Sequence, residues 1–241
     1  MPKWIGKRYA KLWTNFEEEL FTYKDVELLL KKYTSNYLSE LKKCQALVVF
    51  EKEGRKRKYR LISPEIYIYS YAHKIHLESL QQTQYAHLLV KLFYILKENL
   101  GENLLSLGLF GSVAKGTAQR DSDIDLYIIT ENTDLSLVER TEYFLKLKHD
   151  DLISQEIEFL HSQGYNAKIN FISKEKNNLS TNFFTIDITF DMIVLFDTGI
   201  LKQFLGKNKK IIKQQGIQKK FYENEKYYLD LNIEFGEVFE F

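Results

Sequence analysis

The chain has 241 residues, of which 44% are hydrophobic, 28% are charged and only two are proline, so disorder is excluded and the length suits one large domain or two small ones. Cys44 is the only cysteine, which excludes a disulfide framework and a thiolate zinc site and favours a reducing cytoplasm. The formal net charge is +1, and no apolar stretch approaches the length of a membrane span or the apolar core of a signal peptide, so we expect no membrane partner.

The first 63 residues are the basic part of the chain. They contain fifteen Lys and Arg against eight Asp and Glu, whereas the remaining residues contain nineteen against twenty-five. Apolar spacing, cap residues and turn residues predict three helices and a hairpin in this part. The predicted elements are a helix over 4–19, a helix over 23–32 capped by Thr22, a helix running into a strand over 33–50, and a turn with its return strand over 51–63 around Gly54.

Three helices followed by a basic hairpin predict a winged helix-turn-helix domain over residues 1–63. Such a domain lays its last helix in the DNA major groove and its wing on phosphates. The alternative is a hairpin used only for dimerisation or protein contact, and a homodimer on two half-sites is a further expectation. The residues predicted to bind DNA are Ser35, Asn36, Ser39, Lys42, Lys43, Arg55, Lys56, Arg57 and Lys58, with Thr34, Lys52 and Arg60 as further phosphate partners.

Residues 64–100 predict a helical connector. Pro64 suits the first turn of a helix, and the stretch divides into two helices with a break near Gln81. His73 and His76 lie three residues apart, a spacing that could suit a metal, but no third ligand is near in the sequence. We therefore interpret them as part of a helix face.

A phosphate cradle is predicted where the apolar run LLSLGLF (104–110) ends at Gly111 and Ser112. The run has the length of a strand, and the residues after it can open a helix. A helix that begins in this way offers unpaired backbone N–H groups to an anion, and glycine lets a phosphate approach the backbone closely. The Ser112 hydroxyl adds a donor.

Two aspartates follow on a second predicted strand. Asp123 and Asp125 are two residues apart, so their side chains leave the same face of a strand. Two carboxylates on one face repel each other unless a cation lies between them, and Mg²⁺ (or Mn²⁺) bound to substrate phosphates satisfies this requirement. The pattern therefore predicts phosphoryl or nucleotidyl transfer. Lys115, Arg120 and Ser122 are further candidates for binding the phosphates of the substrate.

In this order, the Gly111-Ser112 and Asp123-Ile124-Asp125 motifs resemble the nucleotidyltransferase superfamily typified by DNA polymerase beta, in particular its minimal nucleotidyltransferase branch. The resemblance implies an α+β fold with a small mixed sheet flanked by helices over 101–241. It implies that Gly111 and Ser112 hold the β- and γ-phosphates and that Asp123 and Asp125 hold the metals. The tail, with Tyr227-Tyr228 and Gly236-Glu237-Val238-Phe239, resembles archaeal proteins that join a winged helix to such a domain.

Many members of that superfamily have a third carboxylate on a later strand. Here the strand predicted in YNAKINFIS (165–173) offers Asn170 at the inward polar position. Its amide oxygen can bind Mg²⁺ but cannot accept a proton as a base. Activity could be slow, could recruit Asp187 or Asp191, or could be absent. We interpret these two aspartates as caps or solvated residues of a helix.

The sequence therefore predicts a Mg²⁺-dependent nucleotidyltransferase that moves NMP from an NTP to a protein, RNA or small-molecule acceptor, fused to a DNA-binding winged helix. One alternative is a DNA-binding regulator whose transferase-like domain binds nucleotide without turnover. Another is an antitoxin that represses its own operon and modifies a partner toxin.

Overall fold

The computed structural model describes residues 3–133, 135–222 and 226–233. The chain forms two compact units, and each is built from two separate stretches of sequence. The first unit contains residues 1–101 and 145–167, and the second contains 102–144 and 168–241. No helix in the described ranges is both long enough and apolar enough to cross a bilayer.

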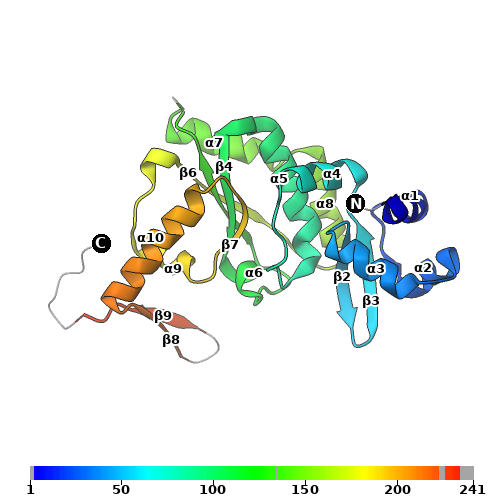
Figure 1. Ribbon diagram of the computed structural model, residues 1–241. Coiled ribbons are helices and arrows are strands. Elements are labelled where there is room, and N and C mark those ends of the chain that lie inside the picture. Colours follow the sequence, from blue (N-terminus) through cyan, green and yellow to red (C-terminus); the bar gives the residue numbers. More distant parts are fainter. Residues whose placement is uncertain (1–2, 134, 223–225, 234–241) are drawn as a thin grey trace. The chain divides into compact units, whose positions relative to one another are not determined.

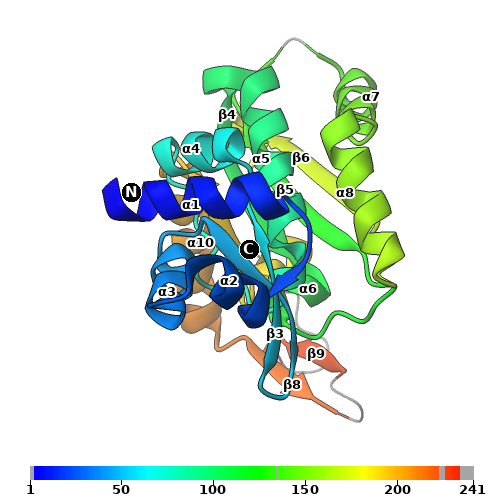
Figure 2. The ribbon, with the colours of Figure 1, turned by 90° about the vertical axis from the view of Figure 1, so that its right-hand side faces the viewer.

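The first unit combines a basic hairpin with helices. Its small sheet is antiparallel and has the order β1-β3-β2. The β2–β3 hairpin extends past α2 and α3 (Figure 2). The elements of the first unit are α1 (Lys3–Phe16), β1 (Phe21–Thr22), α2 (Tyr23–Leu30), α3 (Thr34–Lys43), β2 (Leu47–Glu53), β3 (Lys56–Leu61), α4 (Pro64–Ala72), a 3-10 turn η1 (Thr83–Tyr85), α5 (Ala86–Leu100) and α8 (Asp151–Ser162).

Local signals placed most of these elements correctly. The Asp25 carboxylate accepts hydrogen bonds from the Thr22 backbone N–H at 2.7 Å and from its hydroxyl at 2.8 Å, so the predicted cap of α2 is confirmed. The hairpin turns at Gly54, which has a φ of 57°, as predicted. Cys44 is half-buried at the end of α3.

The connector was predicted less well. Two helices form, but α4 ends at Ala72 and η1 begins only at Thr83, so the break is much longer than expected. The helix-face interpretation of the two histidines is therefore wrong: His73 is the C-cap of α4, and His76 lies beyond the helix. The ring of Tyr69 packs on Phe93 and Tyr94 of α5, with centroids 6.4 and 4.9 Å apart.

The second unit is built on a four-stranded mixed sheet of order β6-β5-β4-β7. Strands β5 and β6 are parallel, and the other pairs are antiparallel. The chain then passes from α10 into the β8–β9 hairpin (Figure 1). The helices and strands of the second unit are β4 (Leu104–Phe110), α6 (Gly111–Lys115), β5 (Ile124–Thr130), β6 (Ile169–Glu175), α9 (Phe183–Thr189), β7 (Ile193–Asp197), α10 (Ile200–Gln215), β8 (Gln218–Phe221) and β9 (Tyr227–Asp230). Helix α7 (Leu137–Leu147) contains the point in the sequence where the chain divides between the units. Two 3-10 turns are η2 (Gly101–Asn103) and η3 (Lys176–Asn178).

Helices α9 and α10 cover one face of this sheet. Ile188 of α9 and Phe204 of α10 join Tyr127 of β5 in one buried cluster. Burying such large apolar side chains contributes about 1.5–3 kcal/mol each. A small mixed sheet flanked by helices is what the resemblance implied, and it holds the strand ends in a fixed register. The tail motif Gly236-Glu237-Val238-Phe239 lies outside the described residues.

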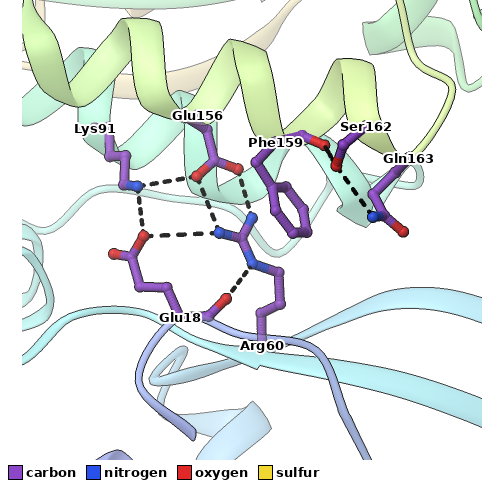
Figure 3. A network of polar contacts seen from close by, with 7 residues as sticks. All are labelled: Glu18, Arg60, Lys91, Glu156, Phe159, Ser162 and Gln163. Atoms are coloured by element: carbon purple, nitrogen blue, oxygen red, sulfur yellow. Dashed lines mark hydrogen bonds and ion pairs between the residues drawn. The ribbon is translucent and has the colours of Figure 1, made fainter.

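A buried network of charged side chains crosses the first unit (Figure 3). The guanidinium of Arg60 on β3 donates to both carboxylate oxygens of Glu156 on α8, at 2.5 and 3.1 Å. Lys91 on α5 lies 2.9 Å from Glu156 and 2.5 Å from Glu18. The network therefore connects four separate parts of the sequence, at Glu18, Arg60, Lys91 and Glu156. Arg60 was predicted to bind phosphate as part of the wing, and this is wrong because its side chain is buried and paired.

Candidate active site

Asp123, Asp125 and Asn170 converge at one end of the sheet. Asp123 directly precedes β5, Asp125 is its second residue, and Asn170 lies opposite Asp125 on β6. The Asn170 amide nitrogen lies 3.1 Å from an oxygen of each carboxylate. The parallel pairing of β5 with β6 thus brings Asn170 beside two aspartates that lie 47 and 45 residues earlier in the sequence.

The donor atoms at this point suit a hard divalent cation. They are two carboxylates and one side-chain amide, and an amide can present either its nitrogen or its oxygen to a neighbour. Carboxylate and amide oxygens are the protein ligands of Mg²⁺. Residues Asp123, Asp125 and Asn170 therefore fit the metal that the sequence predicted.

Gly111 lies against Asp125 because β4 ends where β5 begins. Phe110, the last residue of β4, pairs with Asp125. Gly111 has a φ of 74°, and a Cβ added to it would lie 2.2 Å from the Asp125 Oδ2. The position requires glycine both for its backbone conformation and for the closeness of the carboxylate.

A Gly111→Ala variant is expected to displace Asp125 and to lower the free energy of unfolding by about 1–3 kcal/mol, because alanine is strained at this φ and its methyl group overlaps the carboxylate. Chemical denaturation measures the loss. Gly54→Ala is the matched control, since Gly54 also has a positive φ but has open space around its Cβ position. Equal losses in the two variants would show that the carboxylate contact is unimportant.

The helix after Gly111 is shorter than the sequence suggested. Helix α6 has five residues, and Gly116 ends it with a φ of 77°. One turn has a small macrodipole, so the backbone N–H groups of the turn are its main means of attracting an anion. The Ser112 side chain is half-buried.

The other predicted triphosphate residues are spread around this turn. Arg120 is exposed in the loop before β5. The Ser122 hydroxyl accepts a hydrogen bond of 2.8 Å from the Gln119 backbone N–H and so shapes that loop. Lys115 donates to the hydroxyl of Tyr227 on β9 at 2.9 Å.

No other carboxylate on β6 replaces the missing third acid. Glu175 lies at the far end of β6, five residues from Asn170, or about 16 Å along a strand. Glu175 accepts hydrogen bonds from Thr133, which hold its pKa below the ordinary range, and it pairs with Arg140 at 3.4 Å. Its role is structural, and Asn170 occupies the position next to Asp125.

Asp187 and Asp191 are not the helix caps or solvated residues that were predicted. Asp187 lies on α9, and Asp191 lies after it, before β7. Asp187 accepts from the Tyr227 hydroxyl at 2.8 Å, and Asp191 pairs with Lys219 of β8. The sequence analysis missed Lys219 and Tyr227 as members of this group, because only the β8–β9 pairing brings them near α9.

A second group of possible metal ligands lies in the first unit. Single ligand atoms of Glu18, His87 and Glu156 lie within 4.8 Å of one another. Both oxygens of Glu156 are already bound by Arg60, and burial lowers the pKa of His87 to about 3. Because Arg60 and Lys91 already neutralise the carboxylates, this group does not fit a divalent cation.

Seven of the nine residues predicted to bind DNA line one groove of the first unit. The groove has a volume of about 730 Å³ and lies between α2, α3 and the β2–β3 hairpin. Asn36 and Lys43 are exposed but do not line it, and Thr34 is buried. Lys58 pairs with Glu51 at 2.7 Å across the hairpin. The predicted residues in the groove are Ser35, Ser39, Lys42, Arg55, Lys56, Arg57 and Lys58.

The chain is similar to known proteins over its middle. Residues 89–195 match the nucleotidyltransferase domain family. The putative protein adenylyltransferase MJ1305 of Methanocaldococcus jannaschii is 30% identical over 120 residues, which are 49% of this chain and 76% of that protein. The matched range contains all the residues that converge at the start of β5.

Two solved structures are similar at low identity. A toxin–antitoxin with AMP-PNP and the toxin–antitoxin MntA-HepT each align with 52% of this chain. The alignments cover 86% and 83% of those chains, with 22% and 18% identity and TM-scores of 0.35 and 0.31.

Proposed function

The chain belongs to the nucleotidyltransferase domain family and is an enzyme of that class, and from this premise we propose that it transfers AMP from ATP to a protein side chain with the help of Mg²⁺. The observation that carries the proposal is the convergence of Asp123 and Asp125 beside Gly111. The protein acceptor and the adenine base are proposed because the relative MJ1305 bears the name putative protein adenylyltransferase.

Each residue at the site has a role in this proposal. Asp123, Asp125 and Asn170 hold the metal ions, which when bound neutralise the triphosphate and favour attack on its α-phosphorus. Gly111 and Ser112 bind the β- and γ-phosphates through backbone N–H groups and the serine hydroxyl. Arg120, Ser122 and Lys115 offset the remaining charge. The acceptor hydroxyl forms a bond to the α-phosphorus, and pyrophosphate leaves.

Asn170 cannot accept the proton of the acceptor hydroxyl. An amide is not a base at neutral pH, and no other β6 carboxylate lies at that end of the strand. We propose that the proton passes to solvent or to a group on the acceptor, and that the enzyme contributes mainly positioning and charge compensation.

Label transfer tests the proposed function. The purified protein is incubated with Mg²⁺, each α-labelled NTP in turn, cell extract and total RNA. Label from ATP in a protein band that resists ribonuclease supports the proposal. Label in RNA would show that the acceptor is RNA and not protein. Label from another NTP would show that the base is not adenine. NTP binding without any transfer would instead favour a nucleotide-sensing regulator.

We also propose that residues 1–63 of the first unit form a winged helix that binds DNA. The supporting observation is the groove lined by seven of the predicted residues, four of them basic residues of the β2–β3 hairpin. Such side chains contact phosphates, and a homodimer would place two copies on two half-sites. The same groove could serve a protein partner, as an antitoxin would require.

An Arg55→Ala/Arg57→Ala variant is expected to weaken DNA binding and to reduce the slope of log affinity against log salt by about two, because each lost phosphate contact removes about one released counterion. Fluorescence anisotropy with a duplex at several salt concentrations measures this slope. Lys7→Ala is the matched control, because Lys7 is exposed on α1 and does not line the groove. An unchanged slope would contradict DNA binding in the groove.

A further inference from the structure

Five polar side chains of the second unit form a cluster around Tyr227. They come from α6, α9, the segment before β7, and both strands of the C-terminal hairpin. The members of this Tyr227 cluster are Lys115, Asp187, Asp191, Lys219 and Tyr227. Two cations and two anions surround one neutral hydroxyl, so the cluster is balanced in charge.

In the cluster, Tyr227 donates a hydrogen bond to Asp187 and accepts one from Lys115. The Tyr227 hydroxyl donates its proton to the Asp187 carboxylate, at 2.8 and 2.9 Å from the two oxygens. Its oxygen is then left to accept the Lys115 ammonium at 2.9 Å. Burial and the hydrogen bond to Asp187 raise the pKa of Tyr227 to about 12, so the hydroxyl keeps its proton at neutral pH. Asp187 thus orients Tyr227, and Tyr227 orients Lys115.

The Lys115 ammonium makes a long ion pair in this arrangement. Its partner in this pair, the Asp191 carboxylate, is 4.0 Å away and is already paired with Lys219. The Tyr227 ring also lies 4.4 Å from the Lys115 ammonium and 4.2 Å from that of Lys219. A neutral hydroxyl and a ring face hold an ammonium group in place but leave its charge available to an anion.

The cluster lies at the same end of the sheet as the two aspartates. Phe110 at the end of β4 pairs with Asp125, and Leu109 pairs with Ile193 at the start of β7, two residues after Asp191. Adjacent strands are about 4.8 Å apart, so the start of β7 is on the order of 10 Å from that of β5. Helix α6 begins between them and carries Lys115.

We propose that Tyr227 is a positioning residue that, oriented by Asp187, holds the Lys115 ammonium for the terminal phosphates of the nucleoside triphosphate. This inference rests on the proposed function, because it requires a triphosphate beside Gly111 and Ser112. It gives the β8–β9 hairpin a task in nucleotide binding, although the hairpin lies outside the range that matches the family.

A Tyr227→Phe variant tests the inference, because it keeps the ring and removes only the hydroxyl. We expect the Kd of Mg-ATP, measured by calorimetry, and the KM for ATP to rise about fivefold to tenfold, with kcat nearly unchanged. In a Lys115→Met background, the same substitution should have no further effect on Kd. Tyr228→Phe is the matched control, because Tyr228 is exposed on the same strand and outside the cluster.

The outcomes separate this inference from the proposed function. If the wild type binds and transfers nucleotide but Tyr227→Phe behaves like Tyr228→Phe, the positioning role is wrong and the transferase remains. An equal rise in Kd with and without Lys115 would also overturn it, because a merely structural tyrosine acts independently of the lysine. If the wild type neither binds nor transfers any NTP, both proposals fall.

Discussion

Replacing Asp123 and Asp125 with asparagine is expected to lower nucleotidyl transfer by about a thousandfold. The two carboxylates meet at the Asn170 amide, and Asp125 also lies against Gly111. Metal ions at such a site contribute several kcal/mol of transition-state stabilisation, and each 1.36 kcal/mol is a factor of ten in rate. Two asparagines keep the shape of the site but lose the charge that binds a cation. Single-turnover transfer of α-labelled ATP measures the effect.

The fold should survive this double substitution. Asp123 is exposed and Asp125 is half-buried, and removing two neighbouring negative charges relieves their repulsion. The melting temperature should therefore be equal to or above that of the wild type. Asp121→Asn is the control, because Asp121 is an exposed aspartate of the same loop. Transfer that persists in the double variant would exclude these carboxylates as the metal ligands.

Glu156→Gln is expected to have the largest effect on stability, a loss of about 3–5 kcal/mol in the free energy of unfolding. Glu156 is fully buried and is the shared partner of Arg60 and Lys91 (Figure 3). Burial alone would raise its pKa, but the paired cations outweigh burial and hold the pKa below the ordinary range. The amide leaves two buried cations with only Glu18 to neutralise them. Urea denaturation at pH 7 measures the loss.

The difference in the free energy of unfolding between the wild type and Glu156→Gln should become smaller at acidic pH. A carboxyl whose pKa is lowered in the fold stabilises above its unfolded pKa, and this stabilisation is lost as pH falls through the folded pKa. At a pH below the ordinary pKa range of glutamate, Glu156 of the wild type becomes protonated and neutral, as the amide of the Gln variant is at every pH. Glu158→Gln is the control, because Glu158 is exposed on the same helix. Equal stability of the two variants at pH 7 would contradict the network's role.

The parts of the fold that the sequence predicted are those with local signals. The capping box at Thr22, the turn at Gly54 and the apolar run before Gly111 each need only neighbouring residues, and all were placed correctly. The end of α4 was misplaced because its apolar pattern continues past Ala72, where the helix stops.

The candidate site was predicted where motif spacing is enough. Asn170 could be assigned to the metal site because the resemblance places a third ligand on a later strand, and in the fold it lies opposite Asp125. Tyr227 could not be predicted, because its place beside α6 depends on how the β8–β9 hairpin folds back. Arg60 was misassigned for the same reason, since its partner Glu156 lies 96 residues later.

Because the first unit is built from two separate stretches of sequence, its two parts are synthesised at different times. Arg60 and Lys91 leave the ribosome well before Glu156, which lies in the returning segment 145–167. At about 5–20 residues per second, the 66 residues from 101 to 167 take roughly 3 to 13 s. During this interval the N-terminal segment has two cations and no Glu156, so its core cannot close until β4 and β5 of the second unit have also been made. Because each unit combines two separate stretches of sequence, neither unit corresponds to one continuous segment of the chain.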